Sequence, residues 1–119
     1  MLFGNTLKNT IPEILRHNIT PSVSDLDWVK AYSDSADDSA APVFVKVDVG
    51  LNRLGVPYTE ALNFFREISH HPNIRVDGIM THIALPKEHI EKAFDRFCTV
   101  VTSLEKRGFN IPIKLAAHS

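Results

Sequence analysis

Short apolar segments alternate with helical patterns along this whole chain, and that alternation is its strongest constraint on fold. The apolar segments are rich in β-branched and aromatic residues, as buried parallel strands are. Strands are predicted over 1–4, 19–23, 43–47, 76–84 and 113–117. Strict alternation of strand and helix favours a parallel sheet with helices outside it. An α/β protein is therefore expected.

Helices are predicted between these segments, over 10–18, 24–32, 59–71 and 86–107. Residues 33–42 are acidic, small and polar, and are expected to form a loop. In the last helix an apolar stripe includes Phe94 and Phe97, and Cys98 beside it is expected in the core. Gly108 is expected at the position that follows the end of this helix.

Five parallel strands fit either a doubly wound sheet or part of an eight-stranded barrel, and periodicity does not choose between them. The ends of the chain favour the second. The chain begins within one predicted strand and ends just beyond another, with no terminal helix to cover it. We therefore expect one domain over 1–119 that is part of something larger.

Composition excludes several classes of protein. Lys and Arg total 13 against 14 Asp and Glu, which gives no support to nucleic-acid binding by bulk positive charge. One cysteine provides no disulfide framework or metal cluster, and no histidine pattern typical of zinc sites occurs, so no metal is predicted. No apolar run approaches the roughly 20 residues that span a bilayer, and the N-terminus lacks the features of a signal peptide. A cytoplasmic protein with no membrane partner is expected.

Functional groups of parallel α/β folds gather at the carboxyl ends of the strands. The polar side chains predicted there include Lys46, Asp48, Thr81, His82, His118 and Ser119. Because these strand ends meet at one edge of the sheet, we expect the candidate site at that edge.

The sequence positions of three candidates support a functional role to different degrees. Lys46 stands within an apolar strand, where an ammonium either pairs with a neighbouring carboxylate or tunes a site. Gly50 and Gly55 bracket a tight loop that carries Arg53, a fixed and always charged donor suited to an anion or phenolate. The loop is not a P-loop, because the Lys-Ser/Thr pair after the second glycine is absent. A lone histidine such as His82 is more often structural than catalytic.

Three segments resemble the amino-terminal barrel of alanine racemases: VKVDVGLNRLG (45–55), GIMTHIA (78–84) and KLAAHS (114–119). ITPSVSDLD (19–27) and LFGN (2–5) are also similar to that family, so the resemblance covers essentially the whole chain. It implies strands three to seven of a TIM-type (β/α)8 barrel, or about five βα units, with pyridoxal 5'-phosphate as cofactor. The family interconverts L-alanine and D-alanine for peptidoglycan precursors and forms homodimers.

The resemblance also implies roles for single residues. Arg53 matches the arginine that donates to the phenolic oxygen of the cofactor, and Ser119 matches a serine of the phosphate-binding cup. His82 matches the histidine that stacks near the pyridine ring and hydrogen-bonds a tyrosine base. Lys46 matches a lysine that is carbamylated in some members and then holds Arg53. The sequence departs from the family pattern at His118, where Asn is usual.

Two groups that racemisation requires do not occur in this sequence. Moving the α-proton from one face of the substrate to the other takes two bases. The family uses a lysine from a Y-x-V-x-K-A-x-A-Y-G-H-G motif, which also binds the cofactor covalently, and a tyrosine from a C-terminal β domain. Without them we expect an incomplete chain, inactive on its own. The alternatives are a non-catalytic module that keeps a pyridoxal-phosphate pocket, or a piece of another barrel enzyme similar to D-threonine aldolase.

Overall fold

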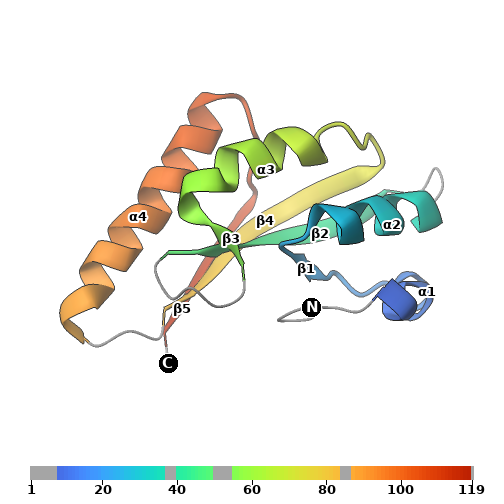
Figure 1. The fold of residues 1–119 in the computed structure, drawn as a ribbon, viewed down its shortest axis with the longest axis horizontal. Coiled ribbons are helices and arrows are strands. Elements are labelled where there is room, and N and C mark those ends of the chain that lie inside the picture. Colours follow the sequence, from blue (N-terminus) through green and yellow to red (C-terminus); the bar gives the residue numbers. More distant parts are fainter. Residues whose placement is uncertain (1–7, 37–39, 50–54, 84–86, 119) are drawn as a thin grey trace.

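The computed structural model describes residues 8–36, 40–49, 55–83 and 87–118, which form one parallel sheet with its main helices on one side (Figure 1). The strands are β1 (Ser22–Val23), β2 (Ala41–Asp48), β3 (Val56–Pro57), β4 (Ile74–Ile83) and β5 (Ile113–His118). The helices are α1 (Ile11–Arg16), α2 (Leu26–Ala36), α3 (Ala61–Ile68) and α4 (Lys87–Lys106), with short 3-10 helices η1 (Lys8–Thr10) and η2 (Tyr58–Glu60). The strand order is β1-β2-β4-β5, and β3 pairs with β2. All these pairings are parallel, which confirms the predicted α/β fold.

The helices α2, α3 and α4 lie side by side over one face of the sheet, which we call the outer face. Along β2, Val43, Val45 and Val47 point to this face and are almost completely buried. In β5, Lys114 forms an ion pair of 3.2 Å with Glu105 of α4, so it also points outward. Burial of this continuous apolar layer supplies most of the driving force for folding.

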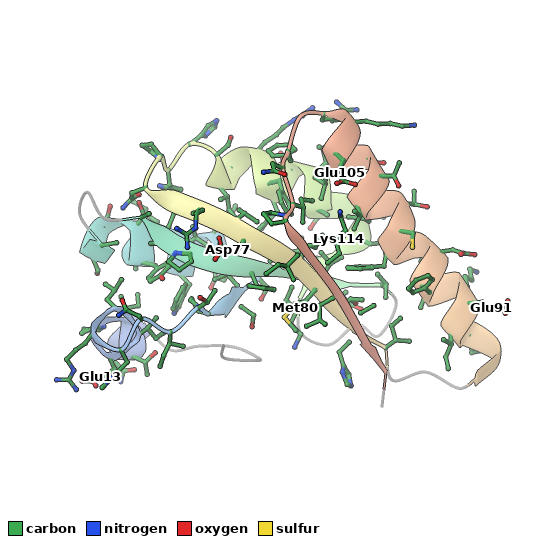
Figure 2. The ribbon with its side chains drawn as sticks, turned by 180° about the vertical axis from the view of Figure 1, so that it is seen from behind. Glu13, Asp77, Met80, Glu91, Glu105 and Lys114 are labelled. Carbon is green, nitrogen blue, oxygen red and sulfur yellow. The ribbon has the colours of Figure 1, made fainter. Side chains whose placement is uncertain are left out.

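The opposite face, which we call the inner face, is seen from behind in Figure 2. Because side chains alternate along a strand, Phe44, Lys46 and Asp48 of β2 point inward. Met80 lies in register with Lys46 and points the same way. Leu115 lies beside Met80 and is 36% exposed, so the inner face is less completely covered among the described residues than the outer face.

A β-bulge interrupts the pairing of β2 with β4. Val43 is opposite Val76, but the next residue, Phe44, is opposite Gly78. Asp77 is therefore the extra residue of β4, and such a residue shifts every later side chain relative to the partner strand. The two strands also approach closely here, because a Cβ on Gly78 would lie 2.8 Å from the Phe44 ring and 2.6 Å from a β5 carbonyl.

The structure confirms most predicted elements and corrects three details. The predicted strand over 1–4 lies outside the described residues. The predicted loop over 33–42 is too long, since α2 continues to Ala36 and β2 begins at Ala41. The short strand β3 was not predicted. Two predictions for α4 are wrong, because Phe94 of the apolar stripe is 48% exposed and Cys98, which was expected in the core, is exposed. Gly108 has a positive φ of 94° after the helix, as predicted.

Candidate functional site

The carboxyl ends of β2 and β4 bring three ionisable side chains to one part of the inner face, which we call the carboxyl edge. Lys46 of β2 is in register with Met80 of β4. Asp48 and His82 lie two residues further along the same strands. All three ionisable side chains are half-buried. The structure thus brings together the described candidates, while Arg53 and Ser119 lie outside the described residues.

The backbone next to His82 is fixed by a buried hydrogen bond between strands. The Thr81 hydroxyl donates to the Val47 carbonyl at 2.7 Å, and the Thr81 side chain is completely buried on the outer face. Sequence reasoning noted Thr81 as a polar residue at a strand end but did not assign it this bond. Because the bond joins β4 to β2 one residue before His82, the imidazole projects from a rigid position.

The carboxyl end of β2 pairs with the short parallel strand β3. Val56 and Pro57 of β3 pair with Val47 and Asp48. Gly55 has a φ of +132°, and a Cβ there would lie 3.0 Å from the Asp48 amide nitrogen. Only glycine meets both conditions without strain, as predicted for this position; Gly50 lies outside the described residues.

Arg96 of α4 holds the same region from the outer side. Its Nη1 donates to the Val49 carbonyl at 3.2 Å, directly after β2. Its guanidinium also lies 4.9 Å from the centre of the Tyr58 ring, directly after β3, in a cation–π contact. Arg96 therefore joins the chain on both sides of residues 50–54. Sequence reasoning missed it, because the partners are 47 and 38 positions away and no local pattern marks them.

On the inner face, Lys46 has no ion-pair partner and Ser22 has no hydrogen-bond partner among the described residues. No ion pair between described residues involves Lys46, so the predicted carboxylate partner is not found among them. The Ser22 side chain is 3% exposed, and its hydroxyl has no hydrogen-bond partner among the described residues. Ser22 lies in register with Phe44 on the inner face. Buried polar groups without partners are costly, so the inner face fits a bound polar group better than a purely apolar filling.

The opposite end of the sheet, which we call the amino edge, is closed by polar contacts. Ser33 Oγ donates to Asn73 Oδ1 at 2.6 Å, and Asn73 Nδ2 donates back to the Ser33 carbonyl at 2.7 Å. The Tyr32 hydroxyl donates to the Pro42 carbonyl at 3.1 Å. Burial, with the Asp77 carboxylate as a second cause, raises the pKa of Tyr32 to about 12. These bonds tie α2 to the starts of β2 and β4.

Two kinds of site are not found among the described residues. No group of three or more His, Cys, Asp or Glu side chains is arranged to hold a metal ion in that part of the chain. None of the helices described there is long and apolar enough to cross a bilayer.

Comparison with known proteins gives consistent results. A family profile described as "Alanine racemase, N-terminal domain" matches residues 1–119. The curated alanine racemase of Clostridium tetani is 32% identical over 126 residues, which cover 100% of this chain and 33% of the relative. Alanine racemase 1 of Caldanaerobacter subterraneus is 28% identical over 126 residues, which cover 100% of this chain and 32% of the relative. The chain thus spans about a third of the length of these relatives.

Solved structures give the same architecture. The alanine racemase of Clostridium difficile 630 superimposes with a TM-score of 0.88 at 25% identity, covering 96% of this chain and 32% of the other. That of Corynebacterium glutamicum has a TM-score of 0.76 at 24% identity, over 87% of this chain and 31% of the other. These likenesses establish that the parallel sheet with outer helices is a partial TIM-type barrel.

Proposed function

Because this chain belongs to the alanine racemase family through its N-terminal domain, we propose that it forms part of the cofactor-binding barrel of a pyridoxal-phosphate-dependent alanine racemase. The observation that carries the proposal is the placement of His82, Lys46 and Asp48 together on the inner face at the carboxyl edge. In TIM-type barrels this is the end at which active sites are built. L-Alanine and D-alanine are the proposed substrates of the complete enzyme.

The described residues fit one side of a pyridoxal-phosphate site. The half-buried His82 imidazole provides a flat ring and two nitrogen atoms. Lys46 offers an amine, and the Ser22 hydroxyl, which has no partner among the described residues, lies on the same face. We propose that Arg53 and Ser119 complete this half of the site, as contacts to the phenolic oxygen and the phosphate.

Each residue then has a separate task. Pyridoxal phosphate, when bound, withdraws electrons from the α-carbon and makes its proton easier to remove. His82 orients the aromatic ring, because the Thr81 bond fixes the backbone next to it, and its imidazole supplies hydrogen-bonding nitrogen atoms. Arg53 holds negative charge without giving up a proton. Lys46 acts as a positioning group for Arg53 when its amine is carbamylated, because the carbamate is an anion that attracts the guanidinium, whereas an ammonium repels it.

None of these residues is proposed as the base that removes the α-proton. In the family that task falls to a lysine and a tyrosine whose motifs do not occur in these 119 residues. A single histidine on one face of the substrate does not return the proton to the other face. We therefore propose that this chain alone binds the cofactor non-covalently and does not racemise alanine.

A chimera tests the family function directly. Residues 1–119 replace the matching segment of the Clostridium tetani alanine racemase, and D-alanine formation is measured. We expect racemase activity in the chimera, and a loss of at least about 100-fold in kcat/KM when it carries His82→Ala or Arg53→Ala. The matched control is His70→Ala, an exposed histidine after α3, which we expect to change activity less than about twofold.

The isolated chain gives the second test. With added pyridoxal phosphate it is expected to show weak binding by fluorescence, no turnover, and no covalent cofactor after borohydride treatment. A folded chimera without racemase activity would contradict the proposed function. Turnover or covalent labelling of the isolated chain would contradict the statement that its bases lie elsewhere.

A further inference from the structure

Arg96 of α4 attaches this helix to the chain that follows β2 through two separate contacts. Its Nη1 donates to the Val49 carbonyl at 3.2 Å, and its guanidinium carbon lies 4.9 Å from the centre of the Tyr58 ring. Val49 is only 1% exposed, so its carbonyl belongs to a buried residue. A hydrogen bond from a charged donor is stronger than one between neutral groups, and a buried carbonyl is costly to leave without a partner. The bond from Arg96 is therefore a significant attachment of α4 to the end of β2.

The charge of Arg96 serves this attachment rather than an ion pair. No ion pair between described residues involves Arg96. The guanidinium is half-buried, and its two contacts are a backbone carbonyl and an aromatic ring. Both partners belong to the segment that connects β2 to α3. Arg96 therefore stabilises the two ends of that connection at once.

The position of Arg96 links this connection to the other half of the candidate site. The helix α4 follows β4, the strand that carries His82. Arg53 lies between the two attached ends, four residues after Val49 and five before Tyr58. Since a residue spans at most about 3.6 Å, the backbone of Arg53 stays within about 14 Å of Val49 in any conformation. Fixing both ends reduces the number of conformations that must be lost when Arg53 is ordered on a ligand.

We propose that Arg96 is a positioning residue of the pyridoxal-phosphate site. It fixes both ends of the 50–54 segment against α4 and so lowers the entropic cost of ordering Arg53 on the cofactor. This role rests on the proposed function, because it takes Arg53 as a contact to the phenolic oxygen. Arg96 projects from a helix on the outer side of the sheet, so it acts through Arg53 and not by touching the cofactor. It should change the affinity for the cofactor without moving a proton.

Hydrogen exchange of the full chain, without cofactor, tests whether Arg96 fixes these ends. Arg96→Met keeps most of the aliphatic stem and removes both contacts. We expect amide exchange at least about fivefold faster in peptides covering 47–58, and unchanged exchange in peptides covering β1 and α2. The matched control Arg66→Met, an exposed change on α3, should alter neither region. Unchanged exchange over 47–58, or an equal rise over the whole chain, would overturn the proposal.

A double-mutant cycle tests whether Arg96 acts through Arg53. Affinity for pyridoxal phosphate is measured by fluorescence titration of the full chain. We expect Arg96→Met to weaken binding at least about fivefold in the wild-type background but less than about twofold in an Arg53→Ala background. Arg96→Lys keeps the charge and should give an intermediate loss. Equal losses in the two backgrounds would show a general structural role and would overturn the proposal.

The two measurements separate the role of Arg96 from the proposed function. If wild type binds pyridoxal phosphate and Arg53→Ala weakens binding while Arg96→Met does not, only the role of Arg96 fails. If exchange rises over 47–58 as expected but wild type does not bind the cofactor, the proposed function fails. The role of Arg96 toward the cofactor then fails with it, and its contacts serve the fold alone.

Discussion

The two ends of the parallel sheet use polar residues in opposite ways. At the amino edge, the Ser33 hydroxyl and the Asn73 amide bond each other, and Tyr32 bonds a backbone carbonyl. At the carboxyl edge, Lys46 and His82 are half-buried and face the inner side of the sheet. In barrel folds the amino end contributes mainly stability and the carboxyl end carries the chemistry. The comparison predicts that substitutions at the amino edge change mainly the free energy of unfolding. Substitutions at the carboxyl edge should change mainly the binding of pyridoxal phosphate.

The largest effect on stability is expected from Asn73→Ala at the amino edge. The substitution removes two side-chain hydrogen bonds and leaves the part-buried Ser33 groups without this partner. We expect the free energy of unfolding to fall by about 3 kcal/mol in urea denaturation. The control Asn110→Ala, at an exposed position, should change it by less than about 0.5 kcal/mol. Similar losses for the two variants would break the assignment of the amino edge to stability.

A smaller effect is expected from the titration of Tyr32. The folded state has a pKa of about 12 for this group, above the value of about 10 for an unfolded tyrosine. Its contribution to stability is therefore fully present below about pH 10 and is lost as the pH rises through about 12, at about 1.4 kcal/mol per pH unit. Denaturation of the wild type and of Tyr32→Phe should differ by this slope. Parallel pH profiles would show that the hydroxyl is not held at this edge.

The smallest effect on stability is expected at the carboxyl edge. His82 is half-buried, so His82→Ala should lower the free energy of unfolding by less than about 1 kcal/mol while weakening pyridoxal-phosphate binding. Denaturation and a fluorescence titration of the same preparation measure both quantities. A loss of stability as large as that of Asn73→Ala, with cofactor binding unchanged, would place His82 among the structural residues.

The sequence predicted those features that depend on local patterns. Apolar runs located β2, β4 and β5, because buried parallel strands are apolar along their length. The positive φ of Gly55 followed from a loop that must turn within a few residues. The resemblance supplied the residues for the candidate site, and the register then placed His82 and Lys46 on the same face.

The features that sequence reasoning missed depend on distant contacts. Composition marked Ser33 as part of a loop, but its bonds to Asn73, 40 residues away, keep it within α2. The predicted burial of Phe94 and Cys98 on α4 was wrong, because the side of a helix that is covered depends on neighbouring elements as well as on its own residues. Arg96 had no local signal, since its partners lie beyond the ends of two other strands.

The unmatched Asp77 in β4 decides which way the imidazole of His82 points. If β4 instead paired without the bulge, Asp77 would lie opposite Phe44 and every later side chain would turn over: Met80 and His82 would face the outer helices, and Ile79 and Thr81 would face inward. The strand would keep its length and its hydrogen-bonding capacity, yet His82 would leave the inner face that it shares with Lys46. The bulge therefore lets β4 hold one residue more than β2 along this stretch while His82 stays on the inner face.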